Sequence, residues 1–144
     1  MSFVTLVDSN VIIDLADSHS ARSDWAFAAI KEMRNTTVLA INPLIYAEVS
    51  VYCSSIRETE EVLPTKFFRR ENLPYEAAFL AGKCFLQYRK RGGSKTSPLP
   101  DFYIGAHATV MKWNLLTRNA KNYRTYFPGL KVISPDMSGS VGKR

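Results

Sequence analysis

The chain begins with a stretch that sets its architecture: Phe3-Val4-Thr5-Leu6-Val7-Asp8-Ser9-Asn10. Residues 3–7 are apolar or β-branched, which predicts a strand covered on both faces. Residues 11–16 resume an apolar pattern that predicts a helix, with Ser9 or Asn10 as its cap. A strand that ends in an aspartate places a charge at the carboxyl edge of a sheet, where open α/β folds bind ligands. Such a buried carboxylate needs a cation or a proton to offset its charge.

Length and composition predict one globular domain, because the 144 residues are 46% apolar and 22% charged. We expect this domain to span residues 1–137 and the tail 138–144 to be disordered. No apolar run is long enough to span a bilayer, and the amino terminus lacks the pattern of a signal peptide. The two cysteines form no C-x-x-C pair, which argues against structural zinc and favours a cytoplasmic location.

Further strands and helices alternate along the chain. Strands are predicted at 37–41, 115–117 and 130–133, and helices at 24–33 (capped by Ser23), from Pro43 (capped by Asn42), at 57–63, 74–91 and 101–113, with a helical turn at 123–127. This alternation predicts a three-layer α/β/α domain around a mostly parallel sheet. We expect the helices at 57–63 and 74–91 to form a helical hairpin that projects from the sheet.

Two more carboxylates fall where the topology can bring them to Asp8. Glu48 lies in an otherwise apolar helix after the second strand, and Asp101 lies at the start of a late helix. Taken one at a time, Glu48 reads as an exposed residue on a polar face, and Asp101 as a helix-start acid stabilised by the helix dipole. Taken together, they lie near the edge where parallel strands end, as do Thr117 and Asn119 after the third strand.

Three carboxylates that meet without cations repel one another strongly. A hard divalent ion such as Mg²⁺, which prefers oxygen ligands and activates bound water, relieves that repulsion. No histidine or cysteine pairs with these acids, so zinc is disfavoured, and His107 is expected to be a packed, hydrogen-bonded residue. The chain also lacks a Gly-rich phosphate loop and a Ser-His-Asp arrangement.

Four motifs in this order resemble PIN-domain ribonucleases of the VapC toxin kind. They are Val7-Asp8-Ser9-Asn10, Glu48, Leu99-Pro100-Asp101-Phe102-Tyr103-Ile104-Gly105-Ala106-His107-Ala108, and Leu115-Leu116-Thr117-Arg118-Asn119, followed by the similar carboxyl region Tyr123-Arg124-Thr125-Tyr126-Phe127-Pro128. The resemblance extends from Leu6 to about Ile133. It implies a PIN-like fold over residues 1–137 and a Mg²⁺- or Mn²⁺-dependent endoribonuclease that is the toxin of a type II toxin–antitoxin system.

The resemblance also assigns roles to individual residues. Asp8, Glu48 and Asp101 match the acids that hold the metal, and Asn10 and Thr117 match polar positions that orient those carboxylates. The fourth catalytic position, typically an aspartate two residues after the threonine, is Asn119 here. An amide can ligate a metal or bind its water but carries no charge, so a second metal ion becomes doubtful.

The partners that the resemblance implies are an antitoxin of the VapB kind, a second copy of the chain in a homodimer, and RNA. Operator DNA is expected only through the antitoxin in a hetero-oligomer, and no membrane is expected. The net charge of +6 suits a polyanionic partner. Candidate RNA-binding residues are Arg69, Arg70, Arg89, Arg91 and Arg118, although each basic cluster taken alone reads as a solvated helix face.

Three functions are therefore compared. The favoured one is cleavage of structured RNA, with tRNA as the expected class, by metal-activated water. The alternative is a catalytically weakened PIN-fold module that binds RNA or acts on DNA through its antitoxin. A phosphatase that forms an aspartyl-phosphate on Asp8 fits less well, because such enzymes commonly need a second acid where Asn10 stands.

Overall fold

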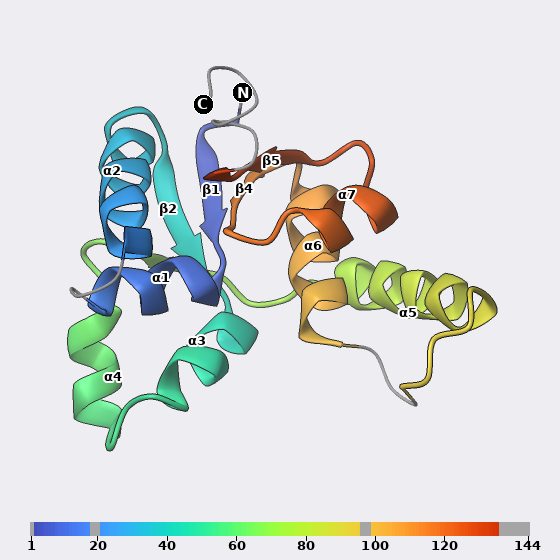
Figure 1. Ribbon diagram of the computed structural model, residues 1–144, viewed down its shortest axis with the longest axis horizontal. Helices are drawn as coiled ribbons and strands as arrows, with labels where there is room; N and C mark the ends of the chain where they lie inside the picture. The colour runs from blue at the N-terminus through green and yellow to red at the C-terminus, as the bar shows by residue number, and fades with distance from the viewer. Residues whose placement is uncertain (1, 18–20, 96–98, 136–144) are drawn as a thin grey trace.

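The fold is a five-stranded parallel sheet with helices to both sides, in a computed structural model that describes residues 2–17, 21–95 and 99–135 (Figure 1). The strands are β1 (Val4–Val7), β2 (Val38–Ile41), β3 (Arg69–Arg70), β4 (Asn114–Leu116) and β5 (Lys131–Ile133). Their order in the sheet is β3-β2-β1-β4-β5, and every neighbouring pair is parallel. The predicted α/β class is confirmed.

Strand β1 lies at the centre of the sheet and marks its topological switch point. The chain runs outward from β1 to β2 and β3, and then crosses to β4 and β5 on the other side of β1. Leu6 pairs with Ala40 on one side and with Leu115 on the other. In parallel sheets, ligands bind beyond the carboxyl ends of strands at such a point. Asp8 directly follows β1 and therefore lies there.

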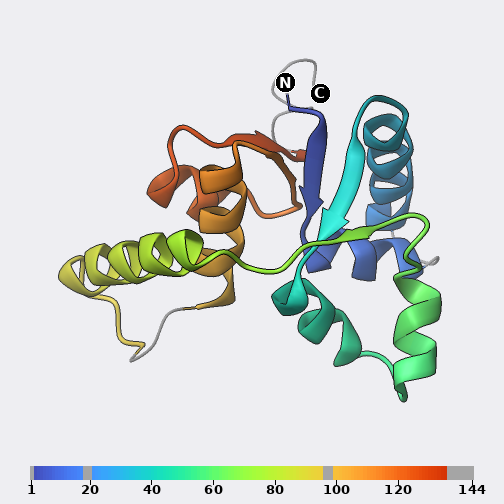
Figure 2. The ribbon, with the colours of Figure 1, turned by 180° about the vertical axis from the view of Figure 1, so that it is seen from behind.

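The described residues form seven helices. They are α1 (Ser9–Ala16), α2 (Ala21–Thr36), α3 (Pro43–Ser50), α4 (Ile56–Val62), α5 (Tyr75–Lys90), α6 (Pro100–Met111) and α7 (Lys121–Tyr126). Helices α1 and α2 lie on one side of the strands, and α6 and α7 on the other (Figures 1 and 2).

Two of the three predicted helix caps are wrong. Asp8, not Ser9 or Asn10, caps α1, because its side chain accepts a hydrogen bond from the Ser9 N–H. Ser23 lies inside α2, which includes Ala21. The cap of α3 is as predicted, since the Asn42 side chain accepts from the N–H of Ile45 and Pro43 follows it.

The predicted hairpin of the helices at 57–63 and 74–91 is also wrong. Strand β3 separates them, and α4 and α5 lie at opposite ends of the molecule (Figures 1 and 2). Helix α5 instead packs against α6. Two charged residues at a sheet edge carry no apolar pattern, so β3 was not predicted; only its pairing with Ala40 and Ile41 defines it.

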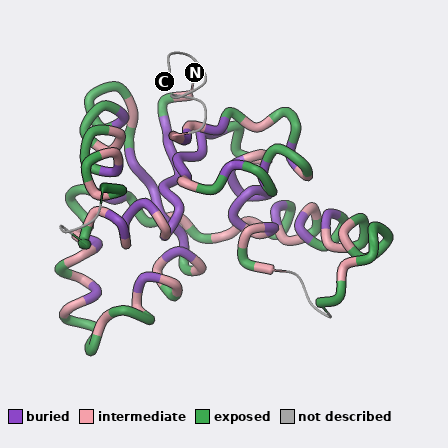
Figure 3. The backbone as a smooth tube through the Cα atoms, in the orientation of Figure 1, coloured by how far each residue is buried: buried purple, intermediate pink, exposed green. Residues whose placement is uncertain are grey.

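The core is built around the central strands, which are buried along most of their length (Figure 3). Leu6, Val7, Leu115 and Leu116 are fully buried. The described residues contain no helix long and apolar enough to cross a membrane. The predicted tail 138–144 lies outside the described residues.

Two helical glycines allow a matched test of the packing between α6 and the segment after α7. A Cβ on Gly105 would lie 2.3 Å from the ring of the buried Phe127, whereas a Cβ on Gly82 in α5 would meet nothing within 4 Å. Gly82→Ala is expected to raise the free energy of unfolding by about 0.5–1 kcal/mol. Gly105→Ala is expected to lower it by about 1–3 kcal/mol, because overpacking forces the ring to move. Urea denaturation measures both, and equal gains would contradict the packing described here.

Candidate active site

Asp8 is the centre of a polar cluster at the carboxyl end of β1. Its side chain is only 3% exposed. Its backbone N–H donates to the carbonyl of Leu116 on β4 at 2.9 Å, which holds the residue in the sheet ladder. Its Oδ1 accepts from the Ser9 N–H at 2.8 Å, so one oxygen is committed to capping α1.

Glu48 reaches this cluster from α3. The Ser9 hydroxyl donates to Glu48 Oε1 at 2.8 Å, and Glu48 is half-buried. The Glu48 carboxylate therefore faces the site. The prediction that Glu48 taken alone is an exposed residue on a polar helix face does not hold.

A threonine and a tyrosine contact the second oxygen of Asp8. The Thr117 hydroxyl, directly after β4, donates to Asp8 Oδ2 at 2.8 Å. The Tyr123 hydroxyl in α7 lies 2.9 Å from the same oxygen and 3.1 Å from Asp101 Oδ1. Leu99 occupies the cap position of α6, so Asp101 is not a cap and its carboxylate contacts Tyr123. The structure thus brings Asp8 and Asp101 to one hydroxyl group.

Asn10 braces this arrangement from α1. Its amide nitrogen lies 3.3 Å from Thr117 Oγ1 and 3.4 Å from Asp8 Oδ2. Its amide oxygen accepts from the Arg118 N–H at 3.0 Å. Arg118 in turn pairs through Nε with the buried Asp14 of α1 at 2.6 Å. These contacts fix the segment after β4 against α1.

Burial raises the pKa of all three acids. Burial and the charge of Asp101 raise the pKa of Asp8 to about 6, although hydrogen bonds from Thr117 and Tyr123 act to lower it. Burial also raises the pKa of Glu48 and of Asp101, and the charge of Asp101 adds to the effect on Glu48. Burial and the nearby charge of Asp8 raise the pKa of the Tyr123 phenol, which therefore stays protonated. The site destabilises its own negative charge.

Each acid keeps one oxygen with spare capacity for a cation. Within the described residues, Asp101 Oδ2 and Glu48 Oε2 accept no hydrogen bond, and Asp8 Oδ1 accepts only one. A carboxylate oxygen has two lone pairs, so each of these atoms can take a further ligand. In the described part of the chain, no three His, Cys, Asp or Glu side chains already stand in an arrangement that could hold a metal ion. The three acids nevertheless offer only oxygen ligands, and the charge of Asp101 repels those of Asp8 and Glu48. Both properties suit a hard divalent cation.

Asn119 lies next to this cluster without joining its acids through any hydrogen bond among the described residues. Its backbone N–H donates to Thr117 Oγ1 at 3.2 Å, and the residue is exposed. At the predicted fourth catalytic position, the structure therefore shows an uncharged side chain at the surface.

The predicted role of His107 is confirmed. Asn42 Oδ1 accepts from Ile45, so the Asn42 amide nitrogen donates to His107 Nδ1 at 3.0 Å. His107 is 1% exposed, and burial lowers its pKa. The ring is a neutral packing residue that links α6 to the cap of α3.

The predicted RNA-binding arginines of β3 lie at the edge of the sheet. Arg70 donates to both carboxylate oxygens of Glu60 at 2.9 Å, and its guanidinium lies 5.2 Å from the centre of the Tyr46 ring. Arg69 pairs with Glu71. Both side chains remain exposed, so they can still meet a polyanion, although each also makes an internal contact.

The remaining predicted arginines divide between two places. Arg89 lies in the last turn of α5 and donates to the carbonyl of Lys95 at 2.7 Å. Arg91 directly follows α5, and its guanidinium lies 5.2 Å from the centre of the Tyr126 ring in α7. Arg118 lies beside the acid cluster and is partly exposed despite its pair with Asp14. Of the five, Arg118 is the one that hydrogen bonds link directly to the cluster.

Two hydroxyl groups in the site were not assigned roles from the sequence. The sequence places Ser9 at a helix cap and in the Asp8 motif, and it places Tyr123 in a helical turn and in the carboxyl region that resembles PIN-domain toxins, with no contact to the acids for either. Nothing in the local pattern shows that Tyr123 is buried, because its neighbours Asn122 and Arg124 are polar. Its position six residues after Thr117 is the one signal that places it near the end of β4.

Fold and site together define a class: a parallel α/β domain with converging carboxylates at the switch point of its sheet. Sequence comparison makes the class specific, because the PIN domain profile matches residues 5–128. The chain belongs to the PIN domain family. PIN domains are generally nucleases that use divalent metal ions.

Solved structures with this fold come from several bacterial toxin–antitoxin complexes. VapBC2 from Rickettsia felis bound to a promoter DNA fragment matches with TM-score 0.69 and 15% identity, over 91% of this chain and 98% of that one. VapBC-1 from nontypeable Haemophilus influenzae matches with TM-score 0.69 and 18% identity, over 91% and 97%. A toxin–antitoxin complex from Klebsiella pneumoniae matches with TM-score 0.66 and 25% identity, over 91% and 97%. A search among curated proteins found no match.

The raised pKa of Asp8 predicts an unusual pH dependence of stability in metal-free protein. Because the folded pKa of about 6 exceeds the ordinary value of 3.8, the stabilising contribution of Asp8 is fully present below 3.8 and is lost as pH rises through 6. Asp8→Asn keeps an oxygen for the cap and removes the charge. In EDTA, it is expected to be more stable than the original chain at pH 8, by up to about 3 kcal/mol, and the difference should shrink toward pH 5. Urea denaturation across this range tests it, and a difference that does not vary with pH would contradict it.

Proposed function

We propose that this chain is the toxin of a toxin–antitoxin system and acts as a Mg²⁺- or Mn²⁺-dependent endoribonuclease. The observation that carries the proposal is the cluster of Asp8, Glu48 and Asp101, oriented by protein hydroxyl groups at the switch point of the sheet. Membership of the PIN domain family and the toxin–antitoxin structures of the same fold support it.

Asp8, Glu48 and Asp101 would hold the metal. When bound, the ion supplies Lewis acidity and a water of lowered pKa for attack on a phosphodiester. The protein orients the three carboxylates: Ser9 binds Glu48, Thr117 binds Asp8, and Asn10 braces both Thr117 and Asp8. Such partners of ligating groups commonly change metal affinity or activity by 10- to 100-fold.

The proposed substrate is structured RNA, with tRNA as the expected class. Arg118 is the basic residue nearest in the hydrogen-bond network to the acids, so it is proposed to contact the phosphate backbone beside the cleaved bond. Arg69 and Arg70 are exposed at the sheet edge, and Arg89 and Arg91 are exposed at the carboxyl end of α5, so these four residues would extend the contact with RNA.

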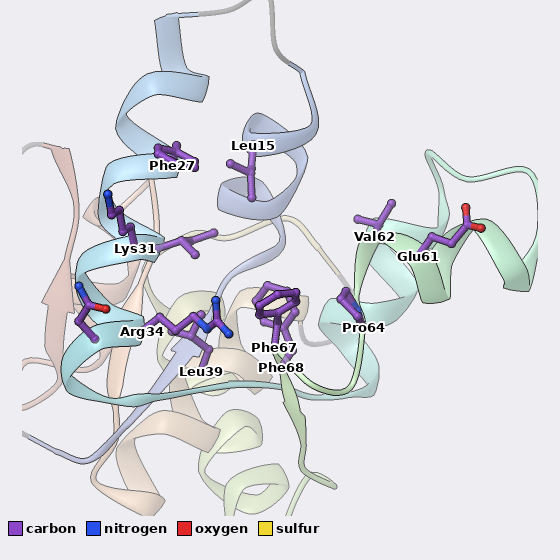
Figure 4. Close-up of a pocket in the computed structure, with 12 residues that line it drawn as sticks. Leu15, Phe27, Lys31, Arg34, Leu39, Glu61, Val62, Pro64, Phe67 and Phe68 are labelled. Carbon is purple, nitrogen blue, oxygen red and sulfur yellow. The ribbon is translucent and has the colours of Figure 1, made fainter.

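The proposed antitoxin site is a hollow of about 570 Å³ between α1, α2, α4 and the segment before β3 (Figure 4). Phe27 and Phe67 line it and are 60% and 36% exposed. Lys31 and Arg34 lie at the same hollow, and the Arg34 guanidinium lies 4.0 Å from the centre of the Phe67 ring. We propose that the antitoxin inserts an apolar segment with acidic neighbours into this hollow. Acidic residues of the antitoxin would complement Lys31, Arg34 and the net charge of +6.

Higher assemblies are part of the same proposal. We propose a homodimer and a toxin–antitoxin hetero-oligomer in which operator DNA is bound through the antitoxin. Solved complexes of the same fold include one bound to a promoter DNA fragment.

The second candidate function is a binding module of the same fold without catalysis. The exposed, uncharged Asn119 favours it, because this side chain adds no fourth charge to the acid cluster. Absence of divalent-ion binding at millimolar concentration would select this alternative.

Asp8→Asn is expected to reduce metal-dependent RNA cleavage at least about 100-fold, because it removes a charge from the proposed metal ligands. The measurement is sequencing of RNA ends after brief induction of the original chain and the variant in parallel. Asp24→Asn, on the exposed surface of α2, is the matched control and should cleave normally. Undiminished cleavage by a folded Asp8→Asn protein would remove the proposed mechanism.

Phe27→Asp is expected to weaken binding of the antitoxin encoded in the adjacent reading frame by at least about tenfold, as for an aromatic residue central to an interface. Co-purification followed by calorimetry measures the loss. Phe3→Asp is the control, because Phe3 is 85% exposed and does not line the hollow. Equal binding by the two variants would place the antitoxin elsewhere.

A further inference from the structure

Tyr123 has an unusual position for a buried tyrosine. Its ring is 1% exposed, and its hydroxyl lies between two carboxylates, 2.9 Å from Asp8 Oδ2 and 3.1 Å from Asp101 Oδ1. A buried phenol needs one hydrogen-bond partner, and Asp8 alone would satisfy it. The hydroxyl carries one proton, so it donates to one carboxylate at a time and holds the other within reach.

The two acids depend on Tyr123 to different degrees. Asp8 is also held by the Ser9 N–H and the Thr117 hydroxyl. For Asp101, the Tyr123 hydroxyl is the one hydrogen-bond partner of the carboxylate within the described residues. Loss of this hydroxyl would therefore leave Asp8 in place and free Asp101 to rotate away from a like charge.

Tyr123 itself is well anchored. It lies in α7, which packs against α6, and its carbonyl accepts from the N–H of Phe127 at 2.8 Å. Phe127 is buried against Gly105 of α6. The hydroxyl is thus held on the helix pair that also carries Asp101.

We propose that Tyr123 is a positioning residue that fixes the Asp101 carboxylate relative to Asp8 and so sets the affinity of the acid cluster for a divalent cation. This inference rests on the proposed function, in which these acids hold the metal. Tyr123 acts through Asp101 and needs no contact with the ion or with RNA.

The test is Tyr123→Phe, which keeps the buried ring and removes only the hydroxyl. Mn²⁺ binding at pH 8, measured by calorimetry and electron paramagnetic resonance, is expected to weaken about tenfold. Tyr126→Phe, in the same helix, is the matched control: its ring packs on Phe102 and lies outside the acid cluster. Its Kd for Mn²⁺ should equal that of the original chain, and near-UV circular dichroism verifies the fold of both variants.

A double-mutant cycle with Asp101→Ala separates positioning from general stabilisation. If Tyr123 acts through Asp101, Tyr123→Phe should leave the Kd for Mn²⁺ unchanged once Asp101 is absent. An equal loss of affinity in both backgrounds would overturn the inference, as would an unchanged Kd for Tyr123→Phe alone. Neither of those results would contradict the proposed ribonuclease activity. If the original chain binds Mn²⁺ but does not cleave RNA, the ribonuclease activity is refuted and the positioning role of Tyr123 is not. A chain that binds no Mn²⁺ would refute both.

Discussion

The structure depends on one electrostatic constraint: a buried aspartate at the end of the central strand, with two further carboxylates brought toward it. Asp8 is almost fully buried, and its raised pKa reflects that burial and the charge of Asp101. Neutral hydroxyl groups offset this cost, and among the described residues no lysine or arginine side chain donates a hydrogen bond to the three acids. Neutral donors orient the carboxylates and leave their charge for a cation to neutralise.

The helices and strands around Asp8 are linked to one another through its side chain. Asp8 caps α1 with one oxygen and binds Thr117 and Tyr123 with the other, so α1, β4 and α7 all converge on a single side chain. Asp14 and Arg118 close the outer side of this arrangement with a short ion pair. A residue that serves as helix cap, hydrogen-bond acceptor and proposed metal ligand has few possible replacements, because each role uses a different oxygen or lone pair.

Much of the fold could be predicted from local patterns, and the errors have physical causes. Central strands such as residues 4–7 are covered on both faces, and a continuous run of apolar or β-branched residues predicts such a strand. Strand β3 consists of Arg69 and Arg70, so only its pairing with β2 identifies it. The partner of α5 was wrongly predicted, because helix pairing depends on where the chain crosses the sheet, and amphipathic periodicity carries no information on that crossing.

The sequence alone was sufficient for the central strands, for Asp8 at the end of the first of them and for the family resemblance, because these depend on residues close together in the chain. The contacts of Ser9 with Glu48, and of Tyr123 with Asp8 and Asp101, required the folded chain, since their partners lie far apart in sequence. The same is true of Arg118, which the sequence predicts as an RNA-binding residue and which the folded chain also pairs with Asp14. Charge and hydroxyl groups gain their roles from burial and from partners at 3 Å or so, and only tertiary packing brings those partners together.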